Sequence, residues 1–203
     1  MTPVYKLSAS SIKGRTNYGS MLAGNAAFVP PSYESIATVS VGSGGATSAE
    51  FTSIPQTYAH LQIRAITRST RAIQSQYVGL QINNDTGSNY KVHILEGNGA
   101  AASSLVDGTT DKAQVGYAAG ANASSNIFGV SVIDILDYTS TNKNKTLRGL
   151  CGIDVNGATG YANLHSGLYF ATPAAITSIK LLCNDGNLAQ YSHFALYGIK
   201  GAA

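Results

Sequence analysis

From Ser35 onward, apolar and polar side chains alternate in short runs that are separated by clusters of turn-forming residues. Such alternation places every second side chain on the same face, which is typical of antiparallel strands that cover a core with one face. The pattern predicts nine or ten strands and no helix of ten residues or more. Strands without intervening helices predict an all-β fold, an antiparallel two-sheet sandwich, and we expect it to be jelly-roll-like.

Three segments carry more specific predictions. Alternation over 37–51 around a glycine cluster at 42–45 predicts a hairpin. Apolar residues on both sides of 127–138 predict a central strand that is covered on both faces. The segment 97–126, which is rich in Gly, Ala, Ser, Asn and Thr, is too long for a plain connection. Within it we expect a short strand near 113–117, a surface loop or an Ala-rich helix.

The first 33 residues differ from the rest of the chain. They show no sustained period and close on two prolines at 30–31, which favour an extended exit into the next segment. We therefore expect an extended N-terminal anchoring arm over 1–33 and a β-sandwich domain over 34–203. The arm is richer in apolar and aromatic groups than a flexible tail. We expect it to bind a partner through Val4, Tyr5, Lys6, Leu7, Ile12, Lys13, Arg15, Tyr18, Met21, Leu22 and Phe28.

The composition excludes several classes of protein. Gly, Ser, Thr and Asn make up 75 of the 203 residues and charged residues only 11%, which argues against a helical bundle. The 44% hydrophobic content is too high for a disordered chain. No apolar run approaches the roughly 20 residues of a membrane-spanning helix. The basic start lacks the continuous apolar region of a secretory signal, so we expect neither a membrane anchor nor export.

The net charge of +3 lies entirely in the arm, because 34–203 contain ten basic and ten acidic residues. Three cations over 33 residues are too dilute for a nucleic-acid-binding surface, which needs a dense basic face with exposed aromatic rings. We therefore expect the arm to contact an acidic protein surface.

No catalytic motif stands out. The chain lacks a phosphate-binding loop, a nucleophile elbow and a zincin motif, so we expect no enzymatic activity and no cofactor. Cys151 and Cys183 lie in strand-like runs, where buried free thiols are favoured and a disulfide is the alternative. Partly exposed histidines are favoured over a metal site for His60, His93, His165 and His193.

The remaining charged groups have structural interpretations. Asp134 and Asp137 lie three residues apart on one strand, so their side chains point to opposite faces and do not suit a glycosidase. Asp107 and Asp111 lack the spacing of a calcium loop. A solvated face with structural tyrosines is favoured over a glycan site for the group of Arg64, Arg68, Arg71 and Lys91 with Tyr77 and Tyr90.

Several stretches have a distinctive wording. They are YKLSASSIKGRTNYGSML at Tyr5–Leu22, VGSGGA at Val41–Ala46, SIPQTYAHL at Ser53–Leu61, NNDTGSNY at Asn83–Tyr90, NIFGVSVIDILD at Asn126–Asp137 and QYSHFALYGI at Gln190–Ile199. Together they span almost the whole chain, and they resemble a family of small structural proteins of tailed bacteriophages.

The resemblance implies a virion component that is made in the bacterial host cytoplasm and attached to the particle through its N-terminal segment. Two functions stay open. The first is a decoration or cement protein on the head, bound to the major capsid protein or other virion proteins. The alternative is an adsorption protein in a tail fibre or tail tip that contacts host surface glycan. A homotrimer is expected, because phage capsid surfaces repeat at threefold positions.

Overall fold

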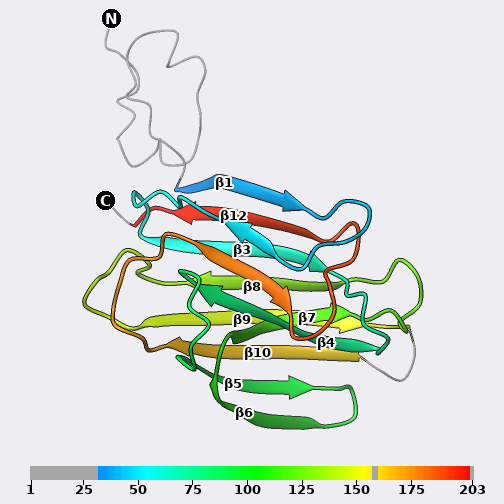
Figure 1. Ribbon diagram of the computed structural model, residues 1–203. Coiled ribbons are helices and arrows are strands. Elements are labelled where there is room, and N and C mark those ends of the chain that lie inside the picture. The colour runs from blue at the N-terminus through cyan, green and yellow to red at the C-terminus, as the bar shows by residue number, and fades with distance from the viewer. Residues whose placement is uncertain (1–31, 157–159, 202–203) are drawn as a thin grey trace, which may run out of the picture.

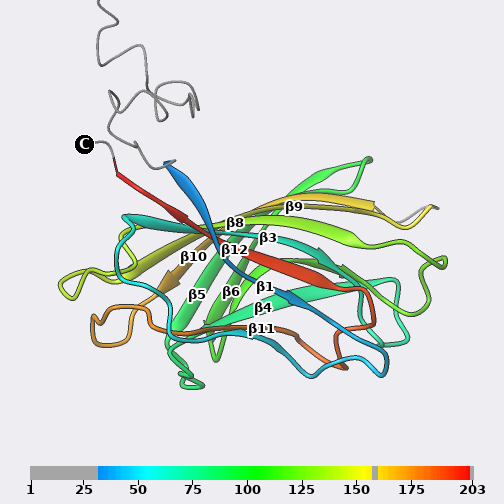
Figure 2. The same ribbon diagram turned by 90° about the horizontal axis from the view of Figure 1, so that it is seen from above.

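The computed structural model describes residues 32–156 and 160–201, which form two β-sheets in two layers (Figures 1 and 2). Within these ranges there is no helix that could cross a membrane. The predicted anchor residues, from Val4 to Phe28, lie outside the described residues. The strands are β1 (Tyr33–Ser40), β2 (Ala49–Phe51), β3 (His60–Thr67), β4 (Ser75–Ile82), β5 (Tyr90–Gly97), β6 (Ala102–Thr110), β7 (Ala113–Ala119), β8 (Gly129–Ile135), β9 (Lys145–Asp154), β10 (Gly160–Tyr169), β11 (Ile179–Cys183) and β12 (His193–Ile199).

The two sheets differ in size. The large sheet has eight strands in the order β1-β12-β3-β8-β9-β10-β5-β6, and the small sheet has four in the order β2-β11-β4-β7. All paired strands are antiparallel. The predicted antiparallel two-sheet sandwich is therefore confirmed, with twelve strands in the described ranges instead of nine or ten.

The strands predicted to form a hairpin lie in different sheets. β1 pairs with β12 at one edge of the large sheet, whereas β2 pairs with β11 in the small sheet. The glycine cluster thus carries the chain from one layer to the other. Gly44 and Gly45 have φ angles of 91° and 77°, which glycine adopts without the strain of other residues. The hairpin prediction is wrong because a turn signal does not specify which sheet the next strand joins.

The small-residue segment 97–126 contains two strands. β6 forms an edge of the large sheet, and β7 forms an edge of the small sheet. The strand expected near 113–117 is therefore confirmed, and the alternatives of a helix or a plain surface loop are wrong.

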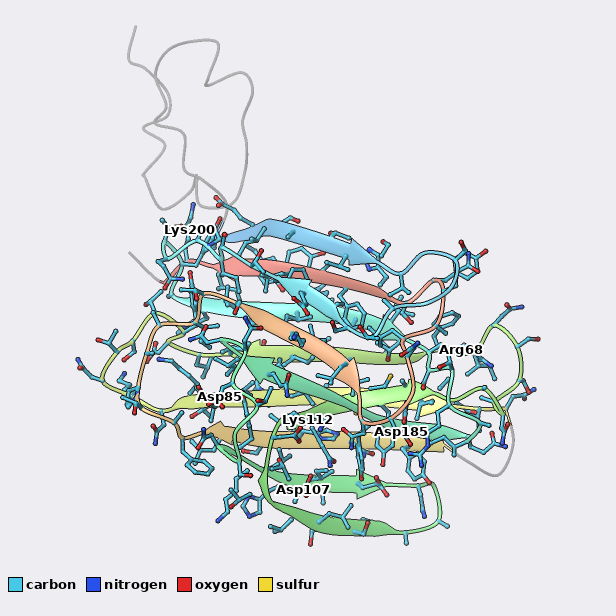
Figure 3. The ribbon with its side chains drawn as sticks, in the orientation of Figure 1. Arg68, Asp85, Asp107, Lys112, Asp185 and Lys200 are labelled. Carbon is cyan, nitrogen blue, oxygen red and sulfur yellow. The ribbon has the colours of Figure 1, made fainter. Side chains whose placement is uncertain are left out.

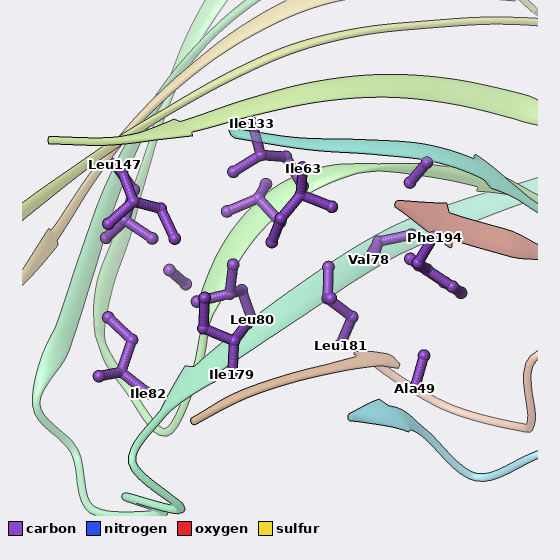
Figure 4. Close-up of a cluster of buried hydrophobic side chains, with 14 of the residues drawn as sticks. Ala49, Ile63, Val78, Leu80, Ile82, Ile133, Leu147, Ile179, Leu181 and Phe194 are labelled. Carbon is purple, nitrogen blue, oxygen red and sulfur yellow. The ribbon is translucent and has the colours of Figure 1, made fainter. Parts of the chain in front are cut away.

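The inner faces of the two sheets enclose an apolar core. Ile63 and Ile133 on the large sheet lie opposite Leu80 and Leu181 on the small sheet, and all four side chains are fully buried (Figure 4). Fully burying a side chain of this size contributes roughly 1.5–3 kcal/mol. The period-two alternation that predicts the strands therefore also supplies the main force that holds the layers together.

Close approach of backbones limits which residues fit where β7 crosses β8 and β9. A Cβ atom on Gly149 of β9 would lie 2.3 Å from the carbonyl oxygen of Val115, and one on Gly129 of β8 would lie 2.1 Å from that of Tyr117. These contacts are to backbone atoms, so no side-chain rotation relieves them. Glycine at these positions lets the two sheets pack this closely.

Replacing Gly149 by alanine tests this crossing. We expect Gly149→Ala to lower the free energy of unfolding by about 1–3 kcal/mol, because the added methyl group forces β7 away from β9. Gly108→Ala on strand β6 is the control, since its Cβ would meet no atom within 4 Å. It should change the stability by less than about 0.5 kcal/mol. Urea denaturation of both variants gives the comparison, and equal stabilities would contradict the crossing.

Candidate functional site

The outer face of the large sheet carries a continuous row of aliphatic side chains. Val132, Leu150, Leu164 and Leu95 are direct cross-strand neighbours on β8, β9, β10 and β5. The three leucines are 62%, 41% and 56% exposed in the order of the row. We call these four residues the aliphatic row. Direct cross-strand neighbours have Cβ atoms about 4.5–5.5 Å apart, so the row forms one raised apolar strip.

A second row with almost no side chains runs beside the aliphatic row. Gly152, Ala162 and Gly97 are neighbours across β9, β10 and β5, and Ala102 extends the line onto β6. Gly152, Ala162 and Gly97 form the floor of a groove of about 700 Å³ that is also lined by Phe128, Val130, Asp154 and Tyr161. We call this groove the glycine trough. The floor of the glycine trough and the aliphatic row lie two residues apart along each strand, which corresponds to about 7 Å.

On the other side of the aliphatic row lies a polar network. The Tyr33 hydroxyl donates to Gln62, whose Nε2 donates to Asp134 Oδ1 at 2.8 Å. Arg148 Nη2 donates to the second Asp134 oxygen at 2.6 Å. Arg64 lies over the rings of Tyr33 and Tyr197, at 5.7 Å from each centroid. This part of the face is polar, and most of its donors and acceptors are already paired.

The strand β10 presents its apolar side to the outside. Its outward positions include Leu164 and Leu168, whereas the inward positions include Asn163 and His165. A strand that covers a core normally has the reverse arrangement. The outer face of β10 thus has the composition of a buried surface.

Exposed apolar groups concentrate on this sheet. Among the described residues, nine of the eleven strongly exposed large apolar side chains lie on strands of the large sheet and none on strands of the small sheet. The small sheet instead presents an ion pair between Lys180 and Glu50 at 3.1 Å. Seven exposed aliphatic residues share the outer face: Ile66, Leu95, Val106, Val130, Leu150, Leu164 and Leu168.

The central strand is not covered on both faces. β8 lies in the middle of the large sheet as predicted, and Ile133 and Ile135 are buried in the core. Val130, however, is 53% exposed on the outer face. The prediction of cover on both faces is wrong within the described residues, because the four-stranded sheet packs on one side only.

A buried polar cluster lies between the layers beneath β7. Cys151 Sγ lies 3.4 Å from His165 Nε2, and both side chains are buried. Glu96 Oε2 accepts hydrogen bonds from the Tyr117 hydroxyl and from Asn163 Nδ2, both at 2.9 Å. The thiol and imidazole have the composition of a nucleophile and its base, so their protonation decides whether they can react.

Burial keeps both groups of this pair neutral. Desolvation raises the pKa of Cys151 to about 12 and lowers the pKa of His165 to about 4. A protonated thiol that is closed off from solvent is neither a good nucleophile nor a metal ligand.

The predicted group of basic residues and tyrosines does not form one face. Arg68 donates to the carbonyl oxygens of Ala123, Ser124 and Ile127 at 2.8–2.9 Å and so holds that loop (Figure 3). Arg71 pairs with Asp185, whereas Arg64 covers Tyr33 and Tyr197. The expected neighbour Tyr90 is fully buried, and its hydroxyl donates to the carbonyl oxygen of Asp85 at 3.0 Å. Sequence spacing missed this because Arg68 and Arg71 lie in the turn after β3 rather than on the strand, while Tyr90 lies on β5, which is not adjacent to β3.

The acidic candidates have separate partners. Asp134 pairs with Arg148, and Asp137 pairs with Lys143 at 2.7 Å. Asp107 accepts a hydrogen bond from Gln114, whereas Asp111 pairs with Lys112. Among the residues that the structure describes, no group of three or more His, Cys, Asp or Glu side chains could hold a metal ion.

The histidines and cysteines differ in their surroundings. His93 is exposed and His60 and His193 are partly exposed, as expected. His165 is fully buried, so the expectation of partial exposure is wrong for this residue. Its inward position follows from the reversed polarity of β10. Cys151 and Cys183 are buried free thiols, as favoured from the sequence.

Comparison of the chain with protein-family models, with curated proteins and with solved structures finds no match. The resemblance to phage structural proteins therefore stays a prediction from the sequence segments given above.

The buried imidazole predicts how stability depends on pH. The unfolded chain binds a proton at His165 near pH 6.5, whereas the folded chain binds it only near pH 4. Because the unfolded state binds more protons between these values, stability falls as the pH is lowered from about 6.5 to about 4, by up to roughly 3 kcal/mol. Urea denaturation at several pH values measures this slope.

The variant His165→Gln should flatten that slope, whatever its effect on absolute stability. The matched control is His93→Gln on the adjacent strand, where the side chain is exposed and the slope should persist. Identical slopes in both variants would assign the pH dependence to other groups.

Proposed function

We propose that this protein is a non-enzymatic structural component of a tailed bacteriophage virion, namely a decoration or cement protein on the capsid. The observation that carries the proposal is the uncovered aliphatic row, because an exposed apolar strip of this kind marks a surface made for assembly. The resemblance of the six sequence segments supplies the type of assembly. The buried and neutral state of the Cys151 and His165 pair supports a role without catalysis.

Attachment to the particle is assigned to the arm. Its apolar and aromatic residues between Val4 and Phe28 would contact the major capsid protein or another virion protein, and Lys6, Lys13 and Arg15 would favour an acidic patch on it. The sandwich would then project from the particle surface, and copies of the chain would associate as a homotrimer.

The alternative is an adsorption protein of a tail fibre or tail tip that contacts host glycan. A sugar-stacking site needs free aromatic ring faces. Arg64 lies over the rings of Tyr33 and Tyr197 on the outer face. Tyr191, which is 73% exposed, is the most open ring among the described residues. Phe128 and Tyr161, which line the glycine trough, are only partly exposed, and Tyr161 is stacked on Tyr117 at 5.2 Å between ring centroids. The lack of a group of strongly exposed rings among the described residues favours the capsid role over the adsorption role.

Locating the chain on intact particles tests the proposal directly. Antibody labelling of purified virus in electron microscopy should mark the heads. Labelling confined to the tail tip would favour the adsorption role, and particles that lack the chain would refute a virion role.

Neutralising the arm tests the anchor. In the full chain, Lys6→Gln, Lys13→Gln and Arg15→Gln together should weaken binding to purified heads at least tenfold, since about 1.4 kcal/mol of lost attraction has this effect. The matched control neutralises three cations of the sandwich: Arg71, Lys143 and Lys180. The control should bind within twofold of the parent in a sedimentation assay. Equal binding by both triple variants would show that the arm cations do not anchor the protein.

A further inference from the structure

We propose that the outer face of the large sheet is buried against another copy of this chain, with the aliphatic row of one copy seated in the glycine trough of the next. This inference rests on the homo-oligomeric state within the proposed function, and it names the surface that would form the contact.

The outer face of the large sheet exposes more apolar surface than a monomer normally leaves in contact with water. Seven aliphatic side chains that are 38–65% exposed lie on one sheet face. Monomeric proteins rarely expose contiguous apolar patches larger than a few hundred Å². The polarity of β10 is reversed in the same sense, because Leu164 and Leu168 face outward while Asn163 and His165 face inward.

The aliphatic row and the glycine trough have complementary shapes. The raised aliphatic row and the hollow glycine trough lie side by side and run parallel to each other across β9, β10 and β5. A twofold axis that runs parallel to both rows and midway between them brings the row of each copy over the trough of the other. The same face therefore supplies both halves of a complementary contact, as contacts between identical subunits require.

The outer face of the large sheet has the area of a stable protein interface. Eight strands spaced about 4.8 Å apart, with about seven residues each at about 3.4 Å, give a face of roughly 900 Å². A stable interface of standard size buries about 800 Å² on each partner. The face is thus large enough for a specific contact between copies.

Charge distinguishes a second copy from the arm as the occupant. The outward positions of the sheet carry three basic residues, Arg64, Arg148 and Lys91, and the two acidic residues Asp134 and Asp154. Asp134 is already neutralised by Arg148 at 2.6 Å. The slight positive excess of this face does not attract an arm of charge +3. The excess is small enough that two copies of the face do not repel each other strongly.

The molar mass of the full chain in solution tests the contact. Light scattering after size-exclusion chromatography at micromolar concentration should give two copies, since a twofold pair joins row to trough on both sides of the contact. Three copies would support the homotrimer of the proposed function and overturn this contact. A monomer at all concentrations would overturn the interface together with the homo-oligomeric state. It would leave the virion location, which antibody labelling tests separately, unaffected.

Variants separate this face from other contacts. Leu150→Lys with Leu164→Lys places two charges in the aliphatic row and should give a folded monomer, because both side chains are already exposed in the single chain. Gly152→Val fills the trough and should also dissociate the copies, since its Cβ meets only one atom, at 3.8 Å. The control Tyr191→Lys lies off the face and should keep the oligomer. Thermal unfolding verifies that all variants are folded.

Other occupants predict different outcomes. If neutralising Lys6, Lys13 and Arg15 dissociates the oligomer while the leucine variant does not, the arm forms the contact and the proposal is wrong. If the chain is monomeric and sediments with phosphatidylcholine vesicles, and the leucine variant loses that binding, lipid is the occupant. An oligomer that survives both the leucine and the valine substitutions would also exclude this face.

Discussion

A four-stranded sheet can cover only one face of an eight-stranded sheet, and this mismatch governs the rest of the structure. The small sheet and its core side chains, such as Leu80 and Leu181, seal the inner face of the large sheet. Nothing within the described residues packs on the opposite face, although β8, β9, β10 and β5 place aliphatic side chains there. Hydrophobic burial, which holds the layers together, is therefore satisfied on one side of the large sheet and left unsatisfied on the other.

The sequence predicts the class of fold well, because alternation within a strand is a local property. It predicts pairing poorly, because partners come from distant parts of the chain. The glycine cluster at 42–45 indicates a turn but not that the chain changes layers there. Alternation at 127–138 correctly identifies apolar residues on both faces of β8. It does not distinguish a face covered by the same chain from a face left for a partner.

The sequence alone does not predict that the outer face carries one continuous apolar row. Leu95, Leu150 and Leu164 are separated by up to 69 positions, and their alignment into one row depends on the register of β5, β10 and β9. The glycines of the trough look like ordinary turn or strand-breaking residues until that register is known. Alternation with Leu164 does place His165 on the opposite face of β10, but it does not tell which of the two faces is buried. Its burial follows from the close crossing of β7, which local sequence does not encode.

The two ends of the described sandwich meet at one corner. The backbone N–H of Lys200 donates to the carbonyl oxygen of Ser32 at 2.9 Å, beside the paired strands β1 and β12. A short linker between these positions would close the sandwich into a ring, so the chain could be reopened at an exposed turn as a circular permutant. Any peptide fused near either position would emerge from the same corner. The domain thus offers a single attachment point from which tandem repeats or displayed cargo could be built.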